Sequence, residues 1–178
     1  MEKPTKFYSD RQETAVAKYL GWKRVAASGA RPFNKGDVQS DRWLCECKTH
    51  TAVCNDYKIS FSVWRKLLRE STSCMRRPVL IVDTGTQKIE DQCVIIPMTF
   101  YDLDYELKMY DPILDNESDF HIRQNEKSFS FSSSVTSVLL KKRYCIRVKF
   151  NDIDVVIMPI EFFKELVDCE SSAIMNKM

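Results

Sequence analysis

Glycine is scarce in this chain of 178 residues, and the scarcity excludes one large class of proteins. Only four glycines are present. A Walker-type loop, which cradles nucleotide phosphates, needs a glycine-rich segment that ends in Gly-Lys-Ser or Gly-Lys-Thr, and the sequence contains none. We therefore expect no nucleotide cofactor.

Long apolar runs are also missing. No stretch approaches the ~20 apolar residues that a membrane-spanning helix requires. The segment from Met1 to Lys6 lacks the apolar stretch of a signal peptide. Both absences predict a protein without membrane contact that works in the cytoplasm.

Cysteine is present, but not in a pattern that forms sites. The seven cysteines are an odd number and are scattered along the chain, whereas a secreted disulfide framework uses even numbers in shorter chains. Only Cys45 and Cys47 have a short spacing, and no second pair completes a zinc site. Reduced thiols are the simpler interpretation.

The net charge of +2 conceals an uneven distribution. Residues 1–80 hold 16 lysines and arginines against 8 aspartates and glutamates, whereas residues 81–178 hold 11 against 17. A basic half is typical of a protein that binds a polyanion, most often nucleic acid. An ordinary but uneven solvated surface explains the same numbers, so charge alone leaves both interpretations open.

Hydrophobic periodicity predicts alternating helices and strands. Apolar residues recur at helical spacing over 9–20, where Ser9 or Asp10 can cap the helix, and over 61–72. Strand-like runs occupy 37–39, 42–49, 78–83, 92–96, 144–150 and 153–158, and a last helix runs from Pro159 to about residue 169. This order predicts an α/β fold in which a central mixed β-sheet is flanked by helices.

An acidic stretch suggests how the chain is divided. Residues 102–119 carry seven acids and one lysine, which is typical of a loop or a boundary. We expect a core of residues 1–108 and a C-terminal α+β extension, residues 109–178, that packs on the core.

The segment with the most chemical information is a hairpin. If Ser40-Asp41 is a two-residue loop, Asp37 pairs with Leu44, and Glu46 becomes the diagonal neighbour of Asp37 on the same face. Lys48 lies two residues beyond Glu46 and therefore projects from that face as well. Cys45 and Cys47 then point to the opposite face, which we expect to be core.

These residue types suit the hydrolysis of a phosphodiester. Asp37 and Glu46 could hold Mg²⁺ or Mn²⁺, which activates water and shields developing charge. Lys48 could orient or deprotonate that water, because a nearby cation and partial burial lower the pKa of a lysine. The backbone carbonyl of Cys47 is a candidate further ligand. The alternative is a charged hairpin on a solvated face.

The wider sequence resembles a known family. The order Glu13, Ser28-Gly29, Gly36-Asp37 and Glu46-x-Lys48 resembles the PD-(D/E)xK nuclease superfamily, and above all its archaeal-type and phage-encoded Holliday junction resolvases. The resemblance covers about residues 8–103, through the segments Ser60-Phe61-Ser62-x-Trp64, Pro78-Val79-Leu80 and Val94-Ile95-Ile96-Pro97. It implies a restriction-endonuclease-like core.

The resemblance also implies residue roles. Asp37 and Glu46 would be metal ligands and Lys48 the catalytic lysine. Glu13 would be the helix acid that approaches the metal, and Ser28 a loop serine near the scissile phosphate. The family's motif proline is Gly36 here, and residues 104–178 fall outside the resemblance.

Two more cations lie beside the expected site. Arg31 and Lys35 are candidates for phosphate contacts, and plain surface charge is their alternative. With Ser28 they form the expected DNA-binding set.

Taken with the resemblance, the residues predict a Mg²⁺- or Mn²⁺-dependent DNA endonuclease. Its expected substrate is branched DNA such as a four-way junction, and symmetric cutting of two strands implies a homodimer. A phage-encoded enzyme acting in a host cytoplasm would fit. Two alternatives stay open: a host-degrading, restriction-like or replication-associated nuclease that acts on duplex DNA, and a catalytically weak DNA- or protein-binding module.

Overall fold

The computed structural model describes residues 4–25, 35–54, 56–101, 107–109, 122–132, 145–150 and 153–175. Its helical elements are α1 (Thr5–Leu20), α2 (Phe61–Ser73), α4 (Ile160–Met175) and the short 3-10 turns η1 (Ile89–Asp91) and η2 (Met98–Phe100). Its strands are β1 (Lys23–Arg24), β2 (Val38–Gln39), β3 (Trp43–Thr49), β4 (Asp56–Ser60), β5 (Arg77–Asp83), β6 (Cys93–Pro97), β7 (Leu107–Met109), β8 (Ile122–Asn125), β9 (Ser128–Ser132), β10 (Cys145–Phe150) and β11 (Ile153–Pro159). None of these helices has the length and apolar character needed to cross a membrane.

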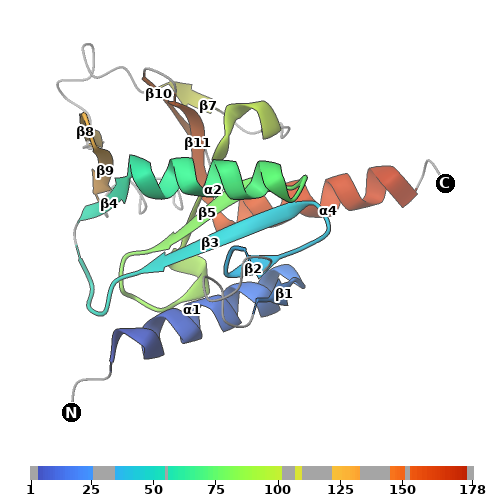
Figure 1. The fold of residues 1–178 in the computed structure, drawn as a ribbon, viewed down its shortest axis with the longest axis horizontal. Coiled ribbons are helices and arrows are strands. Elements are labelled where there is room, and N and C mark those ends of the chain that lie inside the picture. Colours follow the sequence, from blue (N-terminus) through green and yellow to red (C-terminus); the bar gives the residue numbers. More distant parts are fainter. Residues whose placement is uncertain are drawn as a thin grey trace.

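The main sheet is mixed. Its eight strands follow the order β1-β2-β3-β5-β6-β11-β10-β7 (Figure 1). β3 pairs with β5 in parallel, as β10 does with β7, and the other neighbours are antiparallel. Helices lie on both sides of this sheet. The expected α/β fold with a central mixed sheet flanked by helices is confirmed.

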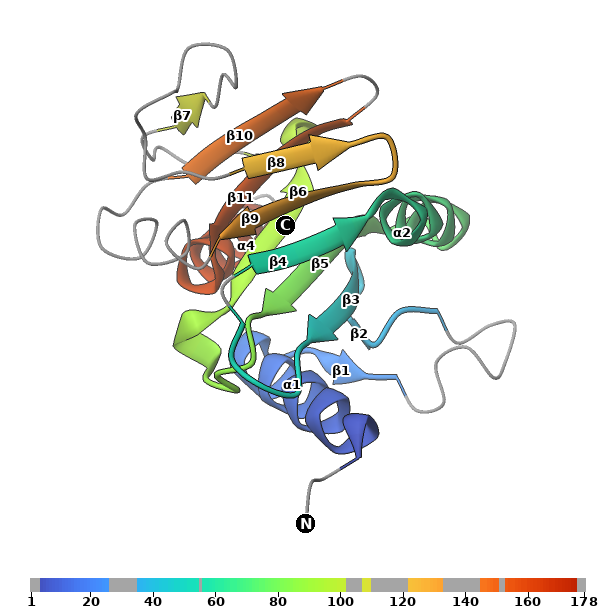
Figure 2. The same ribbon diagram turned by 90° about the vertical axis from the view of Figure 1, so that its left-hand side faces the viewer.

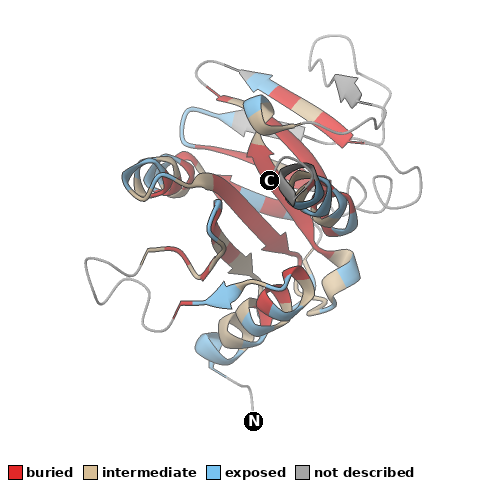
Figure 3. Ribbon diagram, turned by 90° about the vertical axis from the view of Figure 1, so that its right-hand side faces the viewer, coloured by how far each residue is buried: buried red, intermediate tan, exposed pale blue. Residues whose placement is uncertain are grey.

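The two faces of the sheet carry separate apolar clusters, and the middle strands are buried along their length (Figure 3). On one face, Leu44 of β3 packs with Trp64 and Leu67 of α2. On the other face, Cys45 and Cys47 of β3 pack with apolar residues of α1 and α4. Neighbouring residues of β3 therefore face different surroundings, because side chains alternate along a strand.

The C-terminal part of the chain continues the main sheet. β11 pairs with β6 over Val155–Pro159, and β10 pairs with β11. The apolar face of α4 packs against η1, β6 and β11, on the same face of the main sheet as α1. The boundary expected between 108 and 109 stays a prediction. Apart from β7, the acidic stretch 102–119 lies outside the described residues.

A second sheet of three strands, in the order β4-β9-β8, was not expected from the sequence. Figure 2 shows these strands side by side next to α2. Tyr57 and Ile59 of β4 and Phe129 and Phe131 of β9 join the apolar cluster on the α2 side. This small sheet therefore covers part of the face that α2 leaves open.

The β2–β3 hairpin has a different register from the one expected. Val38 pairs with Cys45, and Gln39 pairs with Leu44. The backbone N–H of Ser40 donates to the Trp43 carbonyl at 3.0 Å, so the loop is Asp41-Arg42 rather than Ser40-Asp41. Moving the loop by one residue changes the pairing by two residues, which keeps the same side chains on each face.

The first helix begins earlier than expected. α1 starts at Thr5 behind Pro4, and neither Ser9 nor Asp10 caps it. The Ser9 hydroxyl instead donates to the Thr5 carbonyl within the helix, at 3.5 Å. Serine in a helix interior often makes this bond to the preceding turn, so its local capping signal is lost. α2, in contrast, has a side-chain cap, because the Ser60 hydroxyl accepts from the Ser62 N–H at 3.3 Å.

Candidate active site

Asp37 is tied to the middle of β3. Its backbone N–H donates to the Cys45 carbonyl at 2.7 Å, and its Oδ2 accepts from the Cys47 N–H at 2.8 Å. Asp37 directly precedes β2, whose pairing with β3 begins at Val38 opposite Cys45, and its negative charge acts on Lys48. The carboxylate therefore lies beside the strand that carries Glu46 and Lys48.

Gly36 explains how Asp37 reaches this position. Its φ is +68°, a value that proline cannot adopt. A β-carbon at this residue would lie 2.8 Å from Leu44 Cδ1 and 2.9 Å from the Cys45 carbonyl oxygen. Glycine thus suits both the backbone conformation and the close approach of β3, which accounts physically for the departure from the family's proline.

Glu46 and Lys48 lie together on β3. Lys48 Nζ is 2.6 Å from Glu46 Oε1, and the two side chains are 41% and 14% exposed. By alternation they share the face of Leu44, whereas Cys45 and Cys47 are buried on the opposite face, as expected. Burial raises the pKa of the Cys45 thiol well above its usual range, so this cysteine is a neutral core residue.

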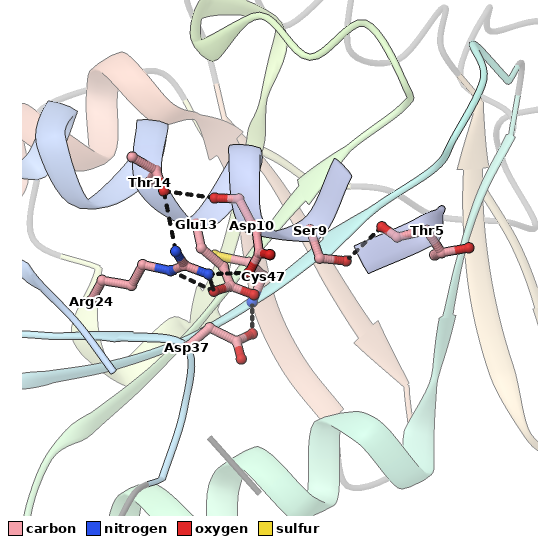
Figure 4. A network of polar contacts seen from close by, with 8 residues as sticks. All are labelled: Thr5, Ser9, Asp10, Glu13, Thr14, Arg24, Asp37 and Cys47. Carbon is pink, nitrogen blue, oxygen red and sulfur yellow. Dashed lines mark hydrogen bonds and ion pairs between the residues drawn. The ribbon is translucent and has the colours of Figure 1, made fainter. Parts of the chain in front are cut away.

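Glu13 approaches the site from α1 (Figure 4). Its Oε2 accepts from Arg24 Nε at 2.8 Å, and the same guanidinium pairs with Asp10. Partial burial raises the pKa of Glu13; the hydrogen bond from Arg24 opposes this shift, and the negative charge of Asp37 adds to it. The carboxylates of Glu13 and Asp37 are therefore close enough for their charges to repel.

The pKa of Lys48 differs from the expectation. Burial lowers it, but attraction to Glu46, the hydrogen bond to Glu46 and the charge of Asp37 outweigh burial and raise it overall. Lys48 is therefore a firmly charged ammonium while it pairs with Glu46. The lowered pKa expected from the sequence depends on a cation nearby and stays a prediction.

The donor set fits a hard divalent cation in its chemistry. Carboxylate oxygens are the ligands that Mg²⁺ and Mn²⁺ prefer, and Mg²⁺ usually takes one or two of them and keeps several waters. Among the described residues, no three His, Cys, Asp or Glu side chains form a group that could hold a metal ion as they stand. Asp37 and Glu46 match this donor chemistry, and a metal held by them stays a prediction. The Cys47 carbonyl stays a predicted ligand.

The expected DNA-contacting residues are only partly described. Lys35 lies against α2, with its Nζ 3.5 Å from Glu70 Oε1. Glu70 is also within 4.0 Å of Lys66, so two cations share one carboxylate. Ser28 and Arg31 lie outside the described residues. Contacts of Ser28, Arg31 and Lys35 with phosphate stay predictions.

Two buried amides beside the site were missed in the sequence. Gln12, one residue before Glu13, is 2% exposed, and Gln92 is fully buried. Gln12, Val16 and Leu20 are all buried on one side of α1 and recur at a spacing of four residues. A glutamine within an apolar stripe was the signal that could have identified Gln12.

Comparison with known proteins yields one structural similarity. No protein-family model and no curated protein matches the chain. Among solved structures, the chain is similar to Hjc, a Holliday junction resolvase from the archaeal hyperthermophile Archaeoglobus fulgidus. The identity is 17%, the match covers 75% of this chain and 90% of that one, and the TM-score is 0.43. A similarity of this size assigns no activity to the chain.

Proposed function

We propose that this protein is a metal-dependent DNA endonuclease that hydrolyses phosphodiester bonds. The observation that carries the proposal is that two carboxylates and a lysine, from β3 and from the residue just before β2, are held along the same part of β3. Asp37 is held to the Cys47 N–H at 2.8 Å, and Lys48 lies 2.6 Å from Glu46. A structural ion pair would not require a second carboxylate bonded to the same strand, nor the close approach of Gly36 to that strand.

Each side chain has a distinct part in the proposed chemistry. Asp37 and Glu46 would hold Mg²⁺ or Mn²⁺, which supplies a Lewis acid and an activated water. Glu13 adds a third negative group at the α1 side. Lys48 would bind and orient a phosphate oxygen or the attacking water, since its ammonium is charged and 41% exposed.

Branched DNA is the proposed substrate, and a homodimer is the proposed assembly. Both rest on the resemblance of Glu13, Gly36-Asp37 and Glu46-x-Lys48 to junction resolvases. Two symmetric cuts in a four-way junction require two active sites related by a twofold axis. Sedimentation of the protein with and without a junction measures this directly, and a dimer in both conditions is expected.

The central test compares the protein with its Glu46→Ala variant. Both are incubated with labelled four-way junction, linear duplex and single strand, with and without Mg²⁺. We expect metal-dependent cutting of the junction that is lost in Glu46→Ala. Glu90→Ala is the matched control, because Glu90 is an exposed glutamate on η1 outside the site, and it should cut normally.

The outcomes separate the remaining alternatives. Cutting of plain duplex at the same rate as the junction would replace the resolvase with a nuclease that acts on duplex DNA. Binding of DNA without cutting at any Mg²⁺ or Mn²⁺ concentration would reject the enzyme and leave a binding module. Equal cutting by wild type and Glu46→Ala would place the active site elsewhere.

A further inference from the structure

Gln12 joins the helix that carries Glu13 to the strand that carries Lys48. Its Nε2 lies 3.2 Å from the Lys48 carbonyl and 3.4 Å from the Ile81 carbonyl of β5. The amide thus reaches the backbone of two neighbouring parallel strands. It does so next to Thr49, where β3 ends, and one residue away from the carboxylate of Glu13.

Gln92 supports this contact from the other side. Gln12 Nε2 lies 3.3 Å from Gln92 Oε1, and Gln92 is fully buried between η1 and β6. The Gln92 carbonyl accepts from the Ile160 N–H at 3.1 Å, at the start of α4. The two glutamines therefore connect α1, β3, β5 and α4 through one small group of hydrogen bonds.

This polar pair is not what stability alone would favour. Among the described residues, Gln12 Oε1 and Gln92 Nε2 have no hydrogen-bond partner although both are buried. A buried polar atom without a partner destabilises the folded state, and apolar side chains of similar shape would avoid that cost. What the pair supplies is a defined position of α1 on the sheet, which apolar packing specifies less sharply.

We propose that Gln12 is a positioning residue for the metal site, and that Gln92 holds it in place. Gln12 sets the distance between Glu13 on α1 and the β3 segment of Glu46 and Lys48. The inference rests on the proposed metal-dependent function, and specifically on metal binding by these carboxylates. Outer contacts that orient metal ligands typically change metal affinity by 10- to 100-fold when they are removed.

The test measures Mn²⁺ binding without DNA, by the electron paramagnetic resonance signal of the free ion. Gln12→Met removes the amide and keeps the length of the side chain. We expect its Kd for Mn²⁺ to rise about tenfold, whereas its thermal midpoint changes by no more than about 4 °C. Gln92→Leu, which leaves the bond from Gln12 to Lys48 in place, should raise the Kd by less.

Val16→Ala is the matched control. Val16 is fully buried on the same face of α1, and its truncation leaves a cavity without removing a hydrogen bond. It should lower the midpoint by at least about 4 °C while leaving the Kd for Mn²⁺ unchanged. If Gln12 acted through stability alone, the variant with the lowest thermal midpoint would also have the highest Kd for Mn²⁺, and Val16→Ala would then raise the Kd most.

Each outcome decides the inference. A raised Kd in Gln12→Met, together with a normal Kd in Val16→Ala, supports the positioning role of Gln12. If the wild type nevertheless cuts no DNA, only the proposed endonuclease activity is rejected. An unchanged Kd in Gln12→Met overturns the positioning role. If Gln12→Met does not fold, a normal Kd in Gln92→Leu overturns it and a raised Kd supports it. A wild type that binds no Mn²⁺ overturns both the inference and the metal site.

Discussion

Two carboxylates on neighbouring strands of the central sheet have opposite surroundings. Asp83, at the end of β5, is fully buried, whereas Glu46, in the middle of β3, has a side chain that is 14% exposed. Glu46 accepts a hydrogen bond from the ammonium of Lys48 at 2.6 Å. Asp83 accepts hydrogen bonds from several donors of the loop that follows it.

Hydrogen-bond donors occupy both carboxylate oxygens of Asp83. Oδ2 accepts from Thr49 Oγ1 at 2.7 Å and from Gln87 Nε2 at 2.8 Å, and Oδ1 accepts from the Gly85 N–H at 3.2 Å and from Thr86 Oγ1 at 3.3 Å. A buried charge persists only with such compensation. Asp83 thereby fixes the loop after β5 and the end of β3.

The difference between Asp83 and Glu46 distinguishes a carboxylate that holds the fold together from one that is able to bind a ligand. A carboxylate whose oxygens are already occupied by neutral donors has no capacity left for a ligand. Glu46 pairs with a lysine side chain that is 41% exposed, so a metal cation can take the place of the ammonium beside Glu46, and the ammonium can turn to a phosphate. Stability should therefore depend on Asp83, and activity on Glu46 and Lys48.

The largest effect is expected for Lys48→Gln. Loss of the ammonium should reduce the cleavage rate about 10²- to 10³-fold, the usual cost of removing one group that stabilises charge developing in the transition state. The free energy of unfolding should change by less than about 1 kcal/mol, because half-exposed ion pairs contribute little. Cleavage assays and urea unfolding measure the two quantities. A loss of stability comparable to that of an Asp83 variant would show that the pair is structural.

Asp83→Asn is expected to lower the stability of the fold and to leave the cleavage rate unchanged. The amide turns an NH₂ group toward donors that need an acceptor, so we expect a loss of about 2–3 kcal/mol in the free energy of unfolding. The fraction that remains folded should keep its cleavage rate. Asp56→Asn is the control, because Asp56 is exposed on β4 and should change neither quantity. Full stability in Asp83→Asn would contradict the structural role.

Gly36→Ala separates backbone strain from crowding at the site. Gly36 and Gly21 have similar φ values, +68° and +71°, but a β-carbon would be crowded only at Gly36, since nothing lies within 4 Å of one at Gly21. We expect Gly21→Ala to cost about 1 kcal/mol from strain alone. Gly36→Ala should cost about 2 kcal/mol and slow cleavage by displacing Asp37. Equal costs would mean that β3 yields to the extra methyl group.

The sequence predicted the parts of the site that depend on alternation along one strand. Glu46 and Lys48 on one face, with Cys45 and Cys47 on the other, follow from the period of two. The position of the loop did not follow, because Ser40-Asp41 and Asp41-Arg42 are both plausible turns. In the structure the Ser40 hydroxyl accepts from the Trp43 N–H at 3.1 Å, which favours the second.

Contacts between distant segments were beyond local patterns. β4 alternates exposed and buried residues, but its partner β9 lies about 70 residues downstream, so nothing near β4 identified a second sheet. The contacts of Gln12 with Lys48, Ile81 and Gln92 span 36 to 80 residues for the same reason. One sequence records the glutamine, and only the fold shows which carbonyls it reaches.

The smallest effect concerns Asp154, a third carboxylate of the main sheet, whose side chain is 36% exposed. Asp154 on β11 accepts two hydrogen bonds from Arg147, at 2.7 and 2.6 Å, in a partly exposed position. The hydrogen bond from Arg147 lowers the pKa of Asp154 below its usual value of 3.8. Because the folded-state pKa is lowered, the pair stabilises the fold above about pH 4, and this contribution is lost as pH falls through the folded-state pKa.

Carbon-detected NMR titration of Asp154 should show a low midpoint that returns toward 3.8 in Arg147→Gln. Lys149→Gln, which removes a weaker charge effect, should raise the midpoint less, and equal shifts in both variants would mean that general charge rather than the paired hydrogen bonds sets the pKa of Asp154.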